Sequence, residues 1–87
     1  MRRLSSYARE LRNELPDAIA AMELAVDAAN PRDPESVAWL RGQLGSLYLK
    51  AGSLPKARLQ FAWAERTFPG HPVVRAGSAR LRAVEGS

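Results

Sequence analysis

The sequence predicts an all-α protein built from about five short helices. Alanine is abundant, β-branched residues are few, and no stretch alternates apolar and polar residues with a period of two. Helix is therefore the favoured state along most of the 87 residues. Proline and glycine mark the breaks, at residues 13–16, 30–34, 52–55 and 69–72. Because each break spans only a few residues, neighbouring helices are expected to be antiparallel.

The first two predicted helices run from about Arg3 to Arg12 and from about Leu15 to Ala29. Apolar residues recur along both of them at helical spacing. Asp17 and Glu23 lie toward the start of the second helix, where the helix dipole favours negative charge. The residues from Asn13 to Pro16 separate the two helices.

The third predicted helix begins at Asp33-Pro34 and ends near Lys50 or Ala51. Asp33 is a suitable N-cap. Pro34 suits the first helical position, because the N–H that proline lacks would have no partner there. Gly52 can adopt the left-handed conformation that ends a helix.

The fourth predicted helix follows Ser53, a plausible N-cap, and runs through Phe68. The fifth opens at Pro72 and ends before Gly86. Apolar residues at helical spacing form the inward face of the fourth helix, namely Leu54, Ala57, Phe61, Ala64 and Phe68.

Composition predicts a single folded domain spanning residues 1–87 and excludes several kinds of site. Hydrophobic residues make up 46% and charged residues 25% of the chain, as in ordinary folded domains. The absence of cysteine excludes disulfides, thiolate zinc sites and a cysteine nucleophile. No apolar run approaches the roughly 20 residues that span a bilayer. The charged start has no apolar stretch behind it and is not a signal peptide, so the cytoplasm is the expected compartment.

The net charge of +4 is unevenly distributed along the chain. Residues 1–40 hold five Arg against seven Asp or Glu, giving −2, and residues 41–87 hold eight Lys or Arg against two Glu, giving +6. A basic half can attract nucleic acid, anionic lipid or an acidic peptide, although a solvated helical surface is the plainer interpretation.

Two stretches of the chain resemble each other. Leu15-Pro16-Asp17-Ala18 corresponds to Leu54-Pro55-Lys56-Ala57, an offset of 39 residues, and the correspondence continues for another two positions. A weaker correspondence relates Gly45 to Ala79, 34 residues later. Periods in this range indicate helical repeats.

The stretch from Leu44 to Pro69 resembles one tetratricopeptide repeat. Small residues stand where two helices of a hairpin approach closely, large residues fill the space on either side, and a proline closes the unit. Arg41 stands where the family usually has tryptophan, and about five extra residues separate this unit from the preceding one. The matching residues are Leu44, Gly45, Tyr48, Ala57, Phe61, Ala64 and Pro69.

The resemblance implies about two and a half repeats, in units 3–30, 37–70 and a partial unit 72–87, stacked as antiparallel hairpins in a short right-handed superhelix. It also implies a protein-interaction scaffold whose first helix in each hairpin lines a concave surface for a partner's peptide or helix. Mapping the family onto this chain places on that surface Arg3, Tyr7, Trp39, Gln43, Ser46, Lys50 and Arg80.

Three aromatic side chains are candidates for contact with a partner, and both tryptophans have a second open interpretation. Tyr7 and Trp39 are candidates for contact energy with a partner. Trp39 is equally well explained as a cover for the neighbouring hairpin. Trp63, with Leu59 beside it, is expected to pack against the next helix, whereas exposure there would indicate a second contact surface.

No pattern for catalysis, metal binding or cofactor binding is found. His71 is the only histidine, and it lies in a turn where it could cap the fifth helix. The glycines at positions 42, 45 and 52 are not followed by the Lys-Ser/Thr pair of a phosphate-binding loop. We therefore expect no cofactor, no metal and no enzymatic activity.

Other interpretations remain open at this stage. The fifth helix has no sixth to pair with, so Val74, Leu81 and Val84 are expected to be uncovered, and a second copy of the chain would cover them in a homodimer. The incomplete third repeat is also compatible with a fragment or a designed piece of a longer array, and a generic helical bundle is the alternative fold.

Nucleic-acid binding is less favoured, because the arginines of the basic half are not interleaved with aromatic residues. The candidates for such binding are Arg58, Arg66, Arg75, Arg80 and Arg82.

Overall fold

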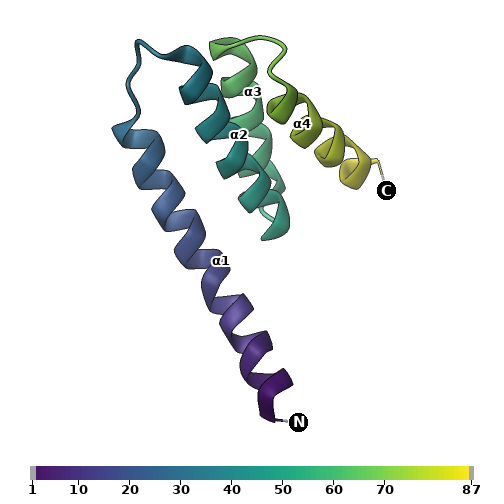
Figure 1. Ribbon diagram of the computed structural model, residues 1–87. Helices are drawn as coiled ribbons and strands as arrows, with labels where there is room; N and C mark the ends of the chain where they lie inside the picture. The colour runs from purple at the N-terminus through teal and green to yellow at the C-terminus, as the bar shows by residue number, and fades with distance from the viewer. Residues whose placement is uncertain (1, 87) are drawn as a thin grey trace.

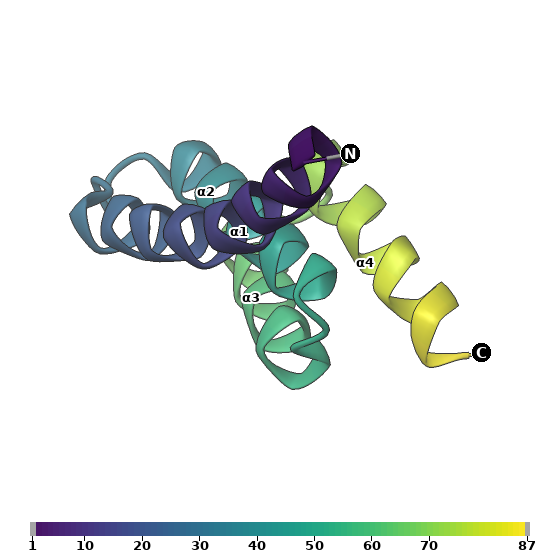
Figure 2. The ribbon, with the colours of Figure 1, turned by 90° about the horizontal axis from the view of Figure 1, so that it is seen from below.

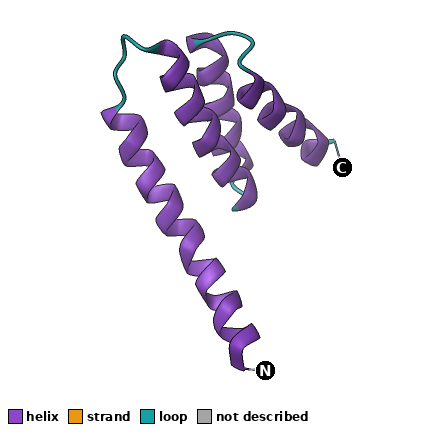
Figure 3. Cartoon of the chain, in the orientation of Figure 1, coloured by secondary structure: helices purple, strands orange, loops and turns teal. Residues whose placement is uncertain are grey.

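The computed structural model describes the backbone of residues 2–86 and the side chains of residues 14–86. The helices are α1 (Arg2–Ala28), α2 (Pro34–Lys50), α3 (Leu54–Thr67) and α4 (Pro72–Glu85), joined by short loops (Figure 3). No strand occurs between residues 2 and 86. The prediction of an all-α protein is therefore confirmed.

The helix α2 is the centre of the arrangement. Successive helices run in opposite directions, and α1 and α4 lie on opposite sides of the α2–α3 pair (Figure 1). Within the described residues, α2 packs against all three other helices, α4 packs against both α2 and α3, and α1 packs against α2 alone. Seen from below, α1 runs alongside α2 while α4 diverges from the pair (Figure 2).

The boundaries of α2 follow from local chemistry. Asp33 accepts hydrogen bonds from the backbone N–H of Ser36 at 3.2 Å and from its hydroxyl at 2.7 Å, which caps the first turn. At the other end, Gly52 adopts φ +80°, and the N–H of Ser53 donates to the carbonyl of Tyr48 at 2.9 Å. After α3, Phe68 ends the helix in an extended conformation, and Gly70 in the following turn adopts φ +81°. The helices predicted over residues 34–50, 54–68 and 72–85 are confirmed to within a residue.

The prediction of separate helices on either side of residues 13–16 is wrong. One continuous helix, α1, runs through Pro16, so the described chain has four helices and not five. Of the three connections between the described helices, two contain a glycine at positive φ, Gly52 and Gly70, and the third, at residues 29–33, contains a proline but no glycine, as do residues 13–16. Proline removes one helical hydrogen bond but does not itself reverse the chain, so the helix continues.

The core lies where α2, α3 and α4 meet. Each of these helices contributes small and large apolar side chains, and α1 adds Ile19, Met22 and Val26 from one side. The inward face predicted for α3 is buried at its centre, whereas Leu54 and Phe68 at its ends are half-buried. The buried core residues are Ala38, Leu44, Tyr48, Ala57, Phe61, Ala64, Val74 and Leu81.

The Phe61 ring fills the space between two glycines. A methyl group on Gly45 of α2 would lie 2.8 Å from Phe61 Cε1, and one on Gly77 of α4 would lie 2.6 Å from Phe61 Cζ. Both distances are shorter than carbon atoms tolerate. The ring therefore occupies the room that both glycines leave, and this contact joins three helices.

The expectation of an uncovered C-terminal helix is wrong for most of its apolar face. Val74 is fully buried and Leu81 is 4% exposed, because α2 and α3 both pack against α4. Only Val84 of the predicted group is exposed, at 49%. The argument for a homodimer that would cover this face loses most of its basis.

We predict that Gly77→Ala lowers the free energy of unfolding by about 1–3 kcal/mol, because the new methyl group overlaps the Phe61 ring. Helix propensity alone would act in the opposite direction, stabilising the variant by about 0.5–1 kcal/mol. Urea unfolding measures the difference. Ala79→Gly, at an exposed position of the same helix, calibrates the propensity effect. A Gly77→Ala variant more stable than the parent would contradict the close contact of the Phe61 ring with Gly77.

We predict that Pro16→Ala strengthens α1, because alanine restores the hydrogen bond that proline cannot donate inside a helix. The helical signal in far-ultraviolet circular dichroism should rise, and the free energy of unfolding should rise by roughly 1–3 kcal/mol. Pro55→Ala is the control, because Pro55 lies in the first turn of α3, where proline costs little. A loss of helical signal in Pro16→Ala would indicate a chain reversal at residues 13–16.

Candidate functional site

One face of α2 carries most of the predicted contact residues. Trp39, Gln43, Ser46 and Lys50 are spaced by three or four residues and so share one side of the helix. We call this set the α2 face. Trp39 is 43% exposed, Lys50 is exposed, and the two residues between them are half-buried.

The structure describes the side chain of only one of the other three predicted contact residues. Arg80 is exposed on α4, away from the four residues in sequence and without a described contact to them. The side chains of Arg3 and Tyr7 lie outside the described residues.

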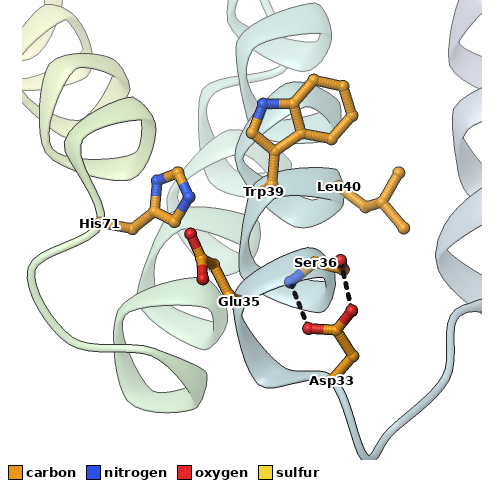
Figure 4. Close-up of a pocket in the computed structure, with 6 residues that line it drawn as sticks. All are labelled: Asp33, Glu35, Ser36, Trp39, Leu40 and His71. Atoms are coloured by element: carbon orange, nitrogen blue, oxygen red, sulfur yellow. Dashed lines mark hydrogen bonds between the residues drawn. The ribbon is translucent and has the colours of Figure 1, made fainter.

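A pocket of about 490 Å³ opens between the start of α2 and the start of α4. Trp39 stands on one wall, and His71 forms the wall that comes from α4 (Figure 4). Sequence reasoning placed Trp39 and His71 on separate elements and gave no signal that they share a cavity. The residues that line this Trp39 pocket are Asp33, Glu35, Ser36, Trp39, Leu40 and His71.

The two carboxylates of the Trp39 pocket differ in their bonding. Asp33 is engaged as the cap of α2, and the hydrogen bonds from the hydroxyl and the backbone N–H of Ser36 hold the pKa of Asp33 below its usual value. Glu35 forms no hydrogen bond or ion pair with any described residue, and it is exposed. Its carboxylate is therefore available to a ligand.

His71 is buried, with 8% of its surface exposed, and it caps α4. A capping role was the expectation from its position in the turn. Its Nδ1 accepts a hydrogen bond from the N–H of Val73 at 3.2 Å, and its ring meets the edge of Phe68 with 5.8 Å between centroids. Because Nδ1 is the acceptor, the neutral ring carries its hydrogen on Nε2. No described residue accepts from that N–H, and Figure 4 shows His71 and Glu35 pointing toward each other across the pocket.

A second tryptophan, Trp63 on α3, has a partner within the chain. The Arg41 guanidinium lies over its ring, with 3.5 Å from Cζ to the ring centroid, and Nη1 of Arg41 donates to Gln60 Oε1 at 2.9 Å. Burial lowers the pKa of Arg41, while the charge of Asp27 on α1 acts in the opposite direction. Trp63 and Leu59 both stay exposed, so the expectation that they pack against a further helix is wrong for this chain.

The arginines of the basic half do not form one free cluster. Arg58 is paired with Glu85 across α3 and α4. Arg75 and Arg82 line another pocket, of about 420 Å³, together with Glu65 and Ser78. Acidic groups thus lie among these arginines.

No cluster of three or more His, Asp or Glu residues capable of holding a metal ion occurs in the described part of the chain. Among the described helices, none combines the length and apolarity that crossing a bilayer requires. Comparisons of the chain with protein-family models, with curated proteins and with solved structures found no match. The groups that the Trp39 pocket offers are an indole, a free carboxylate and an imidazole N–H, which suit recognition by stacking, charge and hydrogen bonding.

The link between α1 and the rest of the molecule includes one buried phenol. The hydroxyl of Tyr48 on α2 donates to Glu23 Oε2 of α1 at 2.9 Å. Burial, followed by the hydrogen bond to Glu23, raises the pKa of Tyr48. Since the folded chain favours the protonated phenol, this contribution to stability is complete below the ordinary phenol pKa of about 10 and is lost as pH rises through the raised value.

We predict that Tyr48→Phe lowers the free energy of unfolding by about 1 kcal/mol at neutral pH, because Glu23 loses its hydrogen-bond donor. The difference between parent and variant should shrink at strongly alkaline pH. In a Tyr7→Phe background, Tyr48 is the only tyrosine, so near-ultraviolet absorbance reports its titration alone. A phenol that titrates at or below its ordinary pKa would contradict the buried hydrogen bond.

Proposed function

We propose that this chain is a tetratricopeptide-like helical-hairpin module that binds a partner polypeptide along the α2 face and performs no chemistry of its own. A segment of the partner, extended or helical, lies between α1 and α4 and covers Trp39. The proposal includes no cofactor and no metal.

Burial of the small residues supports the tetratricopeptide-like part of the proposal. Gly45, Ala57 and Ala64 carry the family's spacing, and all three are buried where α2 and α3 meet. The packing of α4 against both α2 and α3 is what the first helix of a further repeat would do. Because α1 is one continuous helix, the unit expected over residues 3–30 lacks the second helix of a hairpin.

Trp39 is the observation that carries the binding proposal. A large aromatic side chain that is 43% exposed beside a pocket leaves apolar area in contact with water, and aromatic side chains dominate many binding interfaces. Gln43, Ser46 and Lys50 continue the same face with polar groups that can bond to a peptide backbone or a carboxylate.

We predict that peptides selected from a displayed random library against this chain depend on Trp39. Trp39→Ala should lower the affinity of the selected peptides at least about tenfold, since a central aromatic anchor contributes much of the binding free energy. Lys50→Ala should have an effect of only about twofold, because an exposed charge contributes little. Fluorescence anisotropy of the labelled peptides gives both values.

Leu59→Ala is the matched control, because Leu59 is an exposed apolar residue on α3, outside the α2 face. It should leave peptide affinity unchanged. Failure to enrich any peptide, or enrichment of peptides that bind Trp39→Ala as well as the parent, would refute the proposed site.

A further inference from the structure

We infer that the Trp39 pocket binds an arginine side chain of the partner polypeptide, stacked on the Trp39 indole with its guanidinium paired to Glu35. The inference deepens the proposed function, on which it rests, by naming the chemistry that one part of the partner must supply. Four observations support it: the cavity, its charge, the free groups on its walls and a matching arrangement elsewhere in the chain.

The charge of the pocket favours a cation. Its charged lining residues are Asp33 and Glu35, and no Lys or Arg lines it, although the whole chain has a net charge of +4. The start of α2 contributes a partial positive charge of about half a unit, which two carboxylates outweigh. The pocket is therefore a locally acidic site on a basic molecule.

The free groups match an arginine residue within a peptide. Glu35 has no partner in the described structure, and its carboxylate can accept two parallel N–H bonds from a guanidinium. Trp39 has no cation or ring contact with any described residue, so its face is open for stacking. The buried His71 presents an Nε2–H, which a guanidinium does not use but the carbonyl of an adjacent peptide bond does.

The chain already contains this arrangement once, with its own arginine. Arg41 lies over the Trp63 ring and donates to Gln60, which precedes that tryptophan by three residues. Glu35 precedes Trp39 by four residues, again one helical turn away. The Trp39 pocket thus repeats the acceptor and the indole of the internal site, with a full negative charge in place of the amide and without an arginine.

Arginine is preferred to lysine for the same physical reasons. A guanidinium is planar and weakly hydrated, so it stacks on an indole and pairs with a carboxylate at once, whereas an ammonium is a strongly hydrated point charge. A pocket volume of about 490 Å³ is ample for one long side chain and the peptide bonds beside it.

The test is a titration of the full, isotope-labelled chain with the tripeptide acetyl-Ala-Arg-Ala-amide, followed by nuclear magnetic resonance. The control ligand replaces arginine with citrulline, which has the same shape and no charge. We expect weak binding, with shifts at the Trp39 indole N–H and at Glu35 and His71, and at least about fivefold weaker binding of the citrulline peptide. The Trp39→Phe variant identifies the indole signal.

Two charge-removing variants complete the experiment. Glu35→Gln should weaken binding of the arginine peptide about threefold to tenfold and leave the citrulline peptide unaffected. Asp17→Asn, which removes the same charge from an exposed position on α1, should have no effect. Equal affinity for both peptides, shifts confined to other surfaces, or an unchanged Glu35→Gln variant would each overturn the inference.

The outcome is separable from that of the library selection. The tripeptide is too short to span the α2 face, so its failure leaves binding of longer peptides intact. Peptides that need Trp39 but contain no required arginine would retain the proposed function and overturn this inference alone.

Discussion

The contact of the Phe61 ring with Gly45 and Gly77 is the constraint on which the packing of three helices depends. A ring on α3 enters space that exists only because α2 and α4 both lack a side chain at the facing position. Gly42, where a methyl group would lie 3.2 Å from Val74 Cγ2, brings α2 and α4 close in the same way. Interiors are packed as densely as organic crystals, so the crossing of these helices is set by which positions are small.

This packing buries one side of α2 and leaves another side exposed to solvent. Its inner side meets α3, its flanks meet α4 and α1, and Trp39 remains in contact with solvent between those flanks. The helix α1 adds Ile19, Met22 and Val26 to the core and one hydrogen bond from Tyr48 to Glu23, but it does not pack against α3. At the end of the α2 face, Lys50 lines a pocket with Glu14, Leu15 and Ala18 of α1.

The two tryptophans have different surroundings and different roles in the same fold. Arg41 of α2 covers Trp63 of the neighbouring helix, so an aromatic–cation pair joins α2 and α3 at this point. Trp39 lies two residues earlier, which rotates it away from α3 and toward the pocket that His71 and Glu35 share. Its surroundings are acidic because Asp33, which caps α2, and Glu35 both line the pocket.

The sequence by itself determined the helical class, the limits of α2, α3 and α4, and the burial of Leu44, Ala57 and Phe61. These depend on helix propensity, capping residues, glycines at turns and the spacing of apolar residues, all of which are local. Only the tertiary structure decided that α1 continues through Pro16, that Gly77 and not Ala79 receives the Phe61 ring, and that Trp39, Glu35 and His71 line one pocket. Each of these outcomes depends on how far one helix is rotated or extended relative to another, and residue spacing within a single helix does not specify that relation.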